Sequence, residues 1–389
     1  MATEVAPSAT PSVQLEEMTT IFPYRAWQQR EGIQRVEGYY VDDLATLPLQ
    51  PWARKGDSAS GTFINLEGTG GVNDLQLVEI AAGGATNPER HMFEALVYVV
   101  AGNGSASVWY DEANKQTFEW GSGSLFAIPL NAHYRFFNAS GLRAARLAMV
   151  TNAPTVMNLF HNDDFIFNNP FVFRDRFSSE NGYFDGEGKM WKRARNKIWE
   201  TNFVRDVRTI ELHTWSERGA NGRNVLFELA QNSTSAHVSE FPVGTYKKAH
   251  RHGPGAHVII LYGTGFSTLW REGDDAPIRC DWKPNSVVVP PNNWFHQHFN
   301  TGSQPASYLA LKFQGRRYSQ NEQSQNGVDK ADVSVKLGGH QLEYEDEALS
   351  VHQTFEAELQ SNAATCRMHG LVPWCTSNQA PDTLGARGV

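Results

Sequence analysis

Short apolar runs separated by glycine, asparagine and aspartate fill two stretches of the chain. In the first stretch the runs are Leu75–Ile80, Ala95–Val100, Gly104–Trp109 and Ala145–Val150. They are too short for ordinary helices and rich in β-branched and aromatic residues, so they predict β-strands. In the second stretch the same order returns in Ala236–Phe241, His257–Tyr262, Gly265–Trp270, Ser286–Pro290 and Ser307–Lys312. The pattern predicts an all-β protein with two barrels, each closing on itself.

Two helices are predicted outside the barrels. Between Gly188 and Trp199 apolar residues alternate with lysine and arginine at a helical period, which predicts a basic helix packed on a barrel. A calmodulin-target or nucleic-acid-binding segment is the less favoured interpretation. From Tyr344 to about Ser361 the pattern predicts an acidic amphipathic helix that caps a neighbouring element or an interface.

The second stretch also contains a pattern typical of a metal site. His250 and His252 are two residues apart, so a strand places both rings on one face while Arg251 points the other way. About forty residues later a turn rich in proline and asparagine delivers His296. The alternative is that each histidine is a hydrogen-bonded structural group. The agreement of all three positions favours a metal site with these three ligands.

An internal repeat links the two stretches. The spacing around the first two histidines is Gly244-x5-His250-Arg251-His252-x3-Ala256-x6-Gly263, and 161 residues earlier it is Gly83-x5-Glu89-Arg90-His91-x3-Ala95-x6-Gly102. The later motif, Asn285-x5-Pro291-x-Asn293-x2-His296, recurs as Gly123-x5-Pro129-x-Asn131-x-His133. The chain is therefore predicted to be a duplication. The first copy offers Glu89, His91 and His133 as possible ligands, and the alternative is a degenerate barrel that only supports the second.

This double motif resembles that of the cupin superfamily, and the resemblance implies two double-stranded β-helix (jelly-roll) barrels with a few peripheral helices. The usual motif has a glutamate where this chain has Ala256, and Asn285 and Asn293 stand for glycines, which suits them because asparagine tolerates positive φ. Three histidines without the glutamate resemble the ring-cleaving dioxygenases of gentisate, salicylate and hydroxynaphthoate. In those enzymes, however, the complete site usually lies in the N-terminal copy.

The resemblance implies a non-haem Fe(II) dioxygenase whose partners are dioxygen and a small-molecule substrate, a hydroxylated aromatic acid or a related compound. Mn, Ni, Zn or Cu are the alternative metals; zinc favours tetrahedral nitrogen and sulfur ligands, and manganese favours more oxygen ligands. Two other functions stay open. One is a non-redox metal-dependent enzyme, such as a decarboxylase, isomerase or lyase. The other is a non-catalytic binding or storage protein.

Three further residues are candidates near the metal. His298 follows His296 by one alternation and could act as a base or as a fourth ligand. His257 should face away from the ligands unless a bulge turns it inward. Lys312 lies on the same strand face as Tyr308, because their positions differ by an even number. Either this face lines the cavity, so that Lys312 would pair with a substrate carboxylate, or Lys312 faces water.

Length and composition set limits on the rest. The 389 residues suffice for two barrels, and we expect a disordered tail over 1–23, barrels over 60–155 and 217–320, a connection over 156–216 and an extension over 321–389. The net charge of −8 with scattered basic residues excludes a nucleic-acid footprint, and the absence of a long apolar run excludes a membrane span. Met1–Ser12 does not read as a secretory signal, and three cysteines without close spacing imply no disulfides. We expect a cytoplasmic homo-oligomer.

Overall fold

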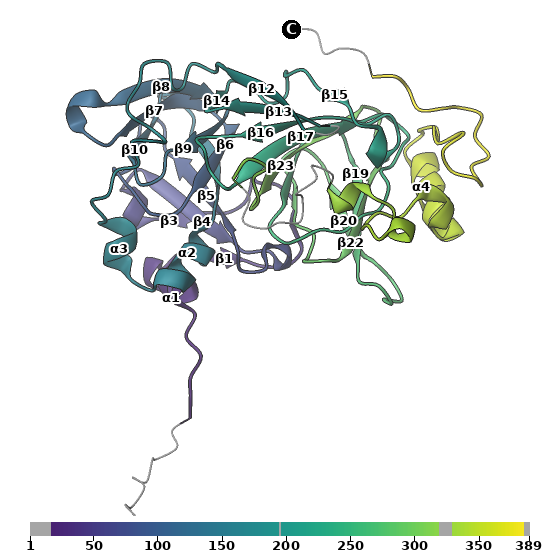
Figure 1. The fold of residues 1–389 in the computed structure, drawn as a ribbon, viewed down its shortest axis with the longest axis horizontal. Helices are drawn as coiled ribbons and strands as arrows, with labels where there is room; N and C mark the ends of the chain where they lie inside the picture. The colour runs from purple at the N-terminus through teal and green to yellow at the C-terminus, as the bar shows by residue number, and fades with distance from the viewer. Residues whose placement is uncertain (1–16, 194–195, 319–328, 385–389) are drawn as a thin grey trace, which may run out of the picture.

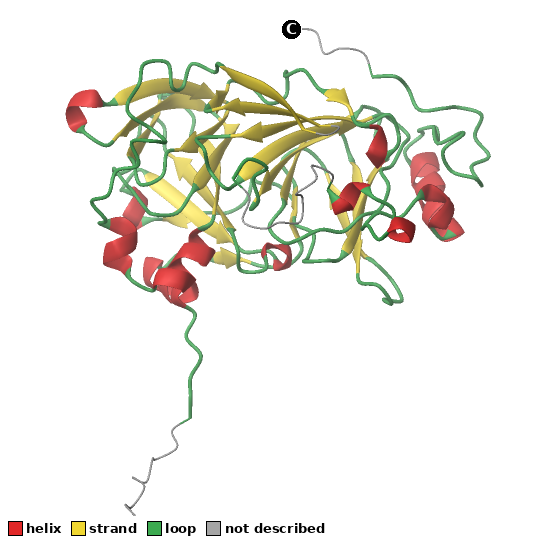
Figure 2. Cartoon of the chain, in the orientation of Figure 1, coloured by secondary structure: helices red, strands yellow, loops and turns green. Residues whose placement is uncertain are grey.

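The computed structural model describes residues 17–193, 196–318 and 329–384, and it is an all-β molecule with two barrels and a few peripheral helices (Figures 1 and 2). The expected disordered tail lies mostly outside the described residues. In the part described, the α-helices are α1 (Pro23–Glu31), α2 (Ala153–Phe160), α3 (Asp163–Phe167) and α4 (Leu349–Ser361). None of these helices has the length and apolar character needed to cross a membrane.

The first barrel has a large and a small sheet. The large sheet has the order β1-β4-β5-β11-β6-β9-β14, with β3 paired to β4, and the small sheet has the order β10-β7-β8. The strands of the large sheet are β1 (Arg35–Val36), β3 (Gln50–Pro51), β4 (Ala59–Ile64), β5 (Asp74–Ile80), β6 (Ala95–Ala101), β9 (Leu125–Ile128), β11 (Ala145–Thr151) and β14 (Phe203–Val204). Those of the small sheet are β7 (Asn103–Trp109), β8 (Gln116–Gly121) and β10 (His133–Asn138).

The second barrel repeats this arrangement. Its large sheet has the order β12-β13-β16-β17-β23-β18-β21-β2, with β15 paired to β16, and its small sheet has the order β20-β19-β22. The strands of the large sheet are β2 (Tyr40–Val41), β12 (Gly188–Arg193), β13 (Asn196–Thr201), β15 (His213–Thr214), β16 (Arg223–Glu228), β17 (Ser235–Phe241), β18 (His257–Tyr262), β21 (Val287–Val288) and β23 (Ala306–Lys312). Those of the small sheet are β19 (Gly265–Trp270), β20 (Ile278–Trp282) and β22 (Phe295–Asn300).

Equivalent irregularities confirm the duplication. The register shifts at equivalent places, between Arg146 and Leu147 where β11 pairs with β6, and between Ile260 and Tyr262 of β18 where it pairs with β23. Asn131 and Asn293 both have positive φ, 57° and 59°, and Asn285 has a φ of 69°. The expectation that asparagine replaces glycine at left-handed positions is thereby confirmed.

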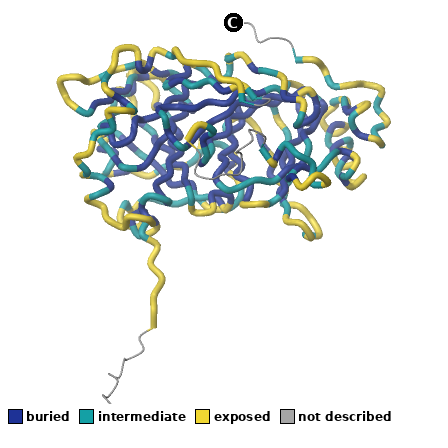
Figure 3. Tube along the Cα trace, viewed as in Figure 1, coloured by how far each residue is buried: buried dark blue, intermediate teal, exposed yellow. Residues whose placement is uncertain are grey.

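The two barrels exchange their edge strands. β2 lies between β1 and β3 of the first barrel in sequence but pairs with β21 of the second, whereas β14 lies in the connection and pairs with β9 of the first. A buried cluster runs through both large sheets and includes Leu77 and Val97 from one and Val238 and Leu309 from the other. The dark interior in Figure 3 accordingly continues from one barrel into the next.

The predicted basic helix is wrong. The segment forms the antiparallel hairpin of β12 and β13, and β13 runs parallel to β16 of the second barrel. Met190 and Trp191 on β12 are exposed rather than packed on a barrel. The acidic helix is found as α4, although it begins only at Leu349, because Tyr344–Asp346 forms a separate 3₁₀ turn.

Candidate metal centre

The three predicted ligands lie together in the second barrel. His296 is on β22, and His250 lies opposite it in an extended segment, with mutual backbone hydrogen bonds of 3.1 and 2.9 Å between their N–H and C=O groups. The carbonyl of His252 accepts the N–H of Asn293 at 2.9 Å, which ties the second motif to the first. One ring nitrogen from each of the three histidines lies within 4.8 Å of the others.

The orientation of the rings fits a metal ion. Each Nδ1 lies near a backbone carbonyl: that of Lys248 for His250 at 3.3 Å, that of Gly253 for His252 at 2.7 Å and that of Trp294 for His296 at 3.3 Å. Carbonyl partners on Nδ1 fix the tautomer in which Nε2 carries the free lone pair. The three side chains therefore suit a divalent cation with imidazole ligands.

Burial keeps these imidazoles neutral, which is the form that binds metals. Burial lowers the pKa of His252 to about 4, and nearby Lys312 adds to the effect. Burial is also the main cause that lowers the pKa values of His250 and His296 well below the usual value. The charge of Arg218 lowers the pKa of His250 further, and that of His252 lowers the pKa of His296 further. Arg251 is outside this cavity and pairs with Glu272 at 3.0 Å, as strand alternation predicted.

The three histidines open into a polar cavity of about 250 Å³. Ala256, which stands where the usual form of the motif has a glutamate, lines this cavity. Among the described residues, the charged side chains that line it are Arg218, Lys312, Arg316, Asp329 and Lys330. The cavity wall is therefore predominantly basic and suits an anion.

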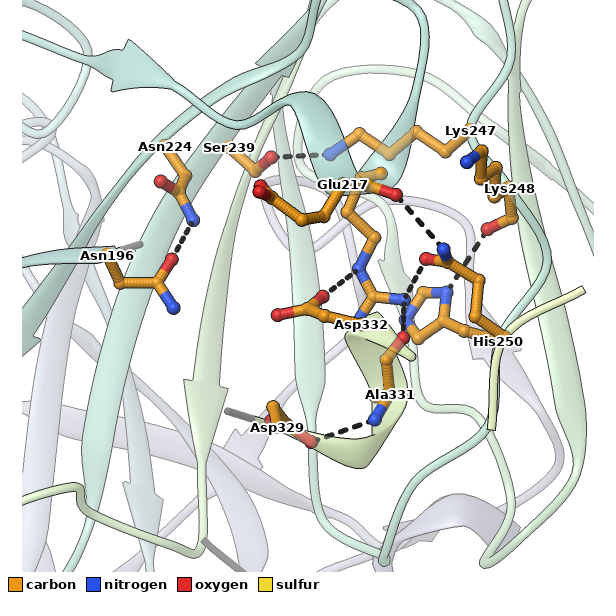
Figure 4. Close-up of polar contacts among 12 residues, drawn as sticks. Asn196, Glu217, Asn224, Ser239, Lys247, Lys248, His250, Asp329, Ala331 and Asp332 are labelled. Carbon is orange, nitrogen blue, oxygen red and sulfur yellow. Dashed lines mark hydrogen bonds and ion pairs between the residues drawn. The ribbon is translucent and has the colours of Figure 1, made fainter. Parts of the chain in front are cut away.

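A short turn, Lys330–Asp332, carries part of the wall and is held by Arg218. The guanidinium of Arg218 pairs with Asp332 at 3.1 Å and donates to the carbonyl of Ala331 at 2.6 Å. Figure 4 shows Asp332 and Ala331 on this turn beside His250. Asp329, which caps the turn, pairs with Arg316 at 2.8 Å.

Lys312 lines the cavity, as do Tyr308 and Ala310 on alternate positions of β23. Within the described part of the chain, no hydrogen bond or ion pair of its amine is found. Burial lowers the pKa of Lys312 to about 7, and neighbouring Arg316 adds to the effect. Of the two orientations open from the sequence, the structure has the one that faces the cavity.

The other two candidates have different surroundings. His298 lines the cavity, and its Nδ1 is 2.7 Å from the hydroxyl oxygen of Ser267, so Nε2 is its remaining polar atom. His257 does not line the cavity; its neighbours Ala256 and Val258 do. Its Nδ1 lies 3.5 Å from the amide nitrogen of Asn73, which belongs to the first half of the chain.

Several residues of the cavity were not found from the sequence. His237 lines it from β17, where it pairs with Ala310, and its alternation with Ser239 inside the predicted strand was a usable signal. Arg218 and Asp329 come from segments without a local pattern. Their place depends on tertiary packing alone.

The first barrel has a different arrangement at the equivalent place. The bridge of Glu89 with Tyr134 corresponds to that of His250 with His296, so Tyr134, and not His133, occupies the position of the third ligand. His133 stacks on Trp109 instead. Glu89 pairs with the buried ammonium of Lys55 at 2.6 Å and accepts the Tyr134 hydroxyl at 3.2 Å.

His91 completes this network, with Nε2 3.2 Å from the Tyr134 hydroxyl. Burial, followed by the charge of Lys55, lowers the pKa of His91 to about 3. The phenol of Tyr134 thus links the imidazole of His91 to the carboxylate of Glu89, which in turn pairs with Lys55. This arrangement supports the alternative that the first barrel is structural.

Comparison with known proteins gives distant similarities only. No family model and no curated protein matches the chain. Among solved structures, an oxalate decarboxylase variant from Bacillus subtilis is 12% identical with a TM-score of 0.45, covering 72% of this chain and 78% of its own. The oxalate decarboxylase of Lactobacillus farciminis, in a formate complex, has the same identity and TM-score and covers 71% and 86%. A 7S globulin of Momordica charantia is 10% identical with a TM-score of 0.46, covering 75% and 90%. The fold is that of two cupin-type barrels, as the strand order and the repeat indicate.

Proposed function

We propose that this chain is a metal-dependent enzyme that transforms a small carboxylate without net oxidation, as a decarboxylase, isomerase or lyase does. The ligands are His250, His252 and His296 of the second barrel. Lys312 binds the substrate carboxylate or transfers a proton to it. The observation that carries the proposal is that three convergent imidazoles and the amine of Lys312, which has no hydrogen bond or ion pair to any described residue, line one cavity.

The size of the cavity supports a small substrate. Pockets for drug-sized ligands have volumes of roughly 300–1,000 Å³. At about 250 Å³ this cavity lies below that range. An acid with few carbon atoms fits it better than a substituted naphthalene, and this weighs against the expected ring cleavage of large aromatic acids.

The basic wall supports an anionic substrate and proton transfer. Arg218 and Arg316 each pair with an aspartate and Lys330 is exposed, which leaves Lys312 as the buried cation best placed to meet a carboxylate. A lysine whose pKa lies near neutrality exchanges protons readily at physiological pH. His298 stays neutral in the same cavity, because burial lowers its pKa to about 3, so its ring can form a hydrogen bond with the substrate without carrying a charge. A bound divalent metal would polarise the substrate oxygens as a Lewis acid.

Ala256 favours a second candidate, the Fe(II)-dependent dioxygenase. Its methyl group lines the cavity and supplies no ligand, so a bound ion would keep open a coordination position that a glutamate would otherwise fill, as dioxygen chemistry requires. Acid–base groups around the centre are unnecessary for that reaction, so we place it second. A non-catalytic binding protein would need neither the three ligands nor Lys312. The cytoplasmic location, the homo-oligomeric state and the expected domain boundaries stay predictions.

The test combines metal analysis with turnover. Protein purified without added metal is assayed by mass spectrometry for metals, and a panel of small mono- and dicarboxylates is followed by NMR while an electrode records dioxygen. We expect anaerobic turnover of a small acid, loss of turnover and of one metal equivalent in His250→Ala, and loss of turnover with metal retained in Lys312→Met. The Arg251→Ala variant, altered next to the ligands but outside the cavity, should keep both.

Turnover that consumes dioxygen in proportion to substrate would contradict the non-redox reaction and support the dioxygenase. Retention of the full metal content in His250→Ala would contradict the ligand assignment. Tight binding of an acid without formation of any product would support the alternative of a non-catalytic binding protein.

A further inference from the structure

A second cluster of metal-ligating side chains lies outside the cavity, in the C-terminal extension. His352 and Glu356 stand one turn apart on α4, and Cys366 and Cys375 follow in the segment after it. One donor atom from each of the four lies within 4.8 Å of all the others. In Figure 1 helix α4 lies at the outer end of the second barrel, away from the barrel interior.

The distances between these donor atoms match a tetrahedral site. The two sulfurs are 3.7 Å apart, Cys366 Sγ is 4.0 Å from His352 Nε2, and Nε2 is 3.2 Å from Glu356 Oε1. Two thiolates bound to one zinc ion at about 2.3 Å would lie ~3.8 Å apart at the tetrahedral angle. A disulfide would require about 2.05 Å.

A neighbouring tyrosine orients the histidine. Nδ1 of His352 lies 3.3 Å from the hydroxyl of the buried Tyr246, so Nε2 is the nitrogen that points to the two cysteines and Glu356. A partner on the other ring nitrogen is the usual support of a metal-bound histidine. His352 is 1% exposed and Cys366 is 9% exposed, whereas Glu356 and Cys375 are half-buried, so the site would be shielded from water on the side of the first two ligands.

We propose that His352, Glu356, Cys366 and Cys375 bind a structural zinc ion. Four protein ligands close the coordination sphere, as in structural rather than catalytic zinc sites. Binding replaces the two thiol protons by the metal, which releases them to solvent, and no electron is transferred.

The zinc ion fastens the end of the chain to the segment that carries the barrel histidines. Tyr246 lies four residues before His250, and its phenol contacts His352. The N–H of Arg367 donates to the carbonyl of Gly244 at 2.8 Å, and a Cβ at Gly244 would meet the carbonyl oxygen of Thr365 at 2.1 Å. The site therefore holds the extension against the beginning of the metal-binding motif.

The test uses the full-length chain with zinc as the probe. Metal analysis of the wild type should find one zinc that survives in the His250→Ala/His252→Ala variant, which lacks the barrel site. The Cys366→Ser/Cys375→Ser variant should lose this zinc and keep the barrel metal. Cys280→Ser is the matched control, because Cys280 is buried inside the second barrel away from the cluster, and it should lose nothing.

A measurement on the wild type guards against misfolding of the variants. Titration with a mercurial reagent should release one zinc, detected by a chromogenic chelator, for every two thiols modified. Cobalt exchanged into the site should show a thiolate-to-cobalt charge-transfer band. Absence of zinc together with two free thiols, or a mass lower by two hydrogens because Cys366 and Cys375 form a disulfide, would overturn the proposal.

Discussion

At the level of single residues, local spacing was sufficient to predict that three histidines converge, but not which residues surround them. His250 and His252 share a strand face by alternation, and a fixed turn brings His296 to them, so a short stretch of sequence contains the geometry. In the first copy the same reasoning chose His133, because it matched the residue type. The backbone instead aligns Tyr134, because the positive-φ Asn131 sets the register.

Lys312 gives a prediction about pH and stability. Its folded-state pKa of about 7 lies below the usual 10.5, so the unfolded chain binds more protons between these two values. In chelator-treated protein, the free energy of unfolding of the wild type should therefore rise relative to Lys312→Met as pH increases from 7 to 10.5. We expect a rise of more than about 1 kcal/mol, allowing for screening by solvent.

Denaturant titrations at several pH values measure this difference. The charged groups that face the amine are Arg218, Arg316, Asp329 and Asp332. All four are still present in the Lys312→Met variant. The exposed Lys192 supplies the control, since Lys192→Met should show a constant difference from the wild type. A difference for Lys312→Met that is flat across the same pH range would contradict the buried amine.

At the level of elements, strands with apolar alternation were predictable, whereas the hairpin of β12 and β13 was not. Its apolar residues fit a helical period by coincidence. What decides its conformation is the parallel pairing of Ile198 with Leu226 and of Trp199 with Phe227, contacts that no local pattern reveals. Tertiary pairing overrides the local signal most easily in such exposed edge segments.

Strand β19 offers a prediction about close packing. A Cβ added at Gly265 would lie 1.9 Å from the carbonyl oxygen of Phe299 and 2.7 Å from the ring of Trp282. Gly265→Ala should lower the free energy of unfolding by about 1–3 kcal/mol, because the barrel interior has no room for the methyl group. Gly121, at the end of β8, has nothing within 4 Å of the same position, so Gly121→Ala should be nearly neutral. Equal free energies of unfolding of the Gly265→Ala and Gly121→Ala variants in urea titrations would contradict the close packing at Gly265.

At the scale of the whole molecule, the duplication was predictable and the exchange of edge strands was not. The repeat shows in the sequence because both copies need the same turns. Pairing of β2 with β21 joins residues almost 250 positions apart, and no spacing rule reaches that far. The common core that results makes the two barrels one structural unit.

We therefore expect the two barrels to unfold in one cooperative transition. Val41 on β2 is buried against the second barrel, so Val41→Asp should lower the midpoint of the whole transition rather than split it. Tyr40→Thr, on the exposed side of the same strand, should change it little. Differential scanning calorimetry measures both, and two separate heat-absorption peaks in the wild type would show that the barrels unfold independently.

Because of the ion pair between Lys55 and Glu89, the two halves of the chain differ in the source of the positive charge at their equivalent sites. In the first barrel the positive charge that faces the carboxylate belongs to a side chain, so it is covalently attached and present from synthesis. No chelator can remove it, and no shortage of metal in the surroundings can deplete it. The charge balance of the Lys55–Glu89 pair is thus complete as soon as the chain folds, whereas that of the histidine cluster would depend on the supply of an ion.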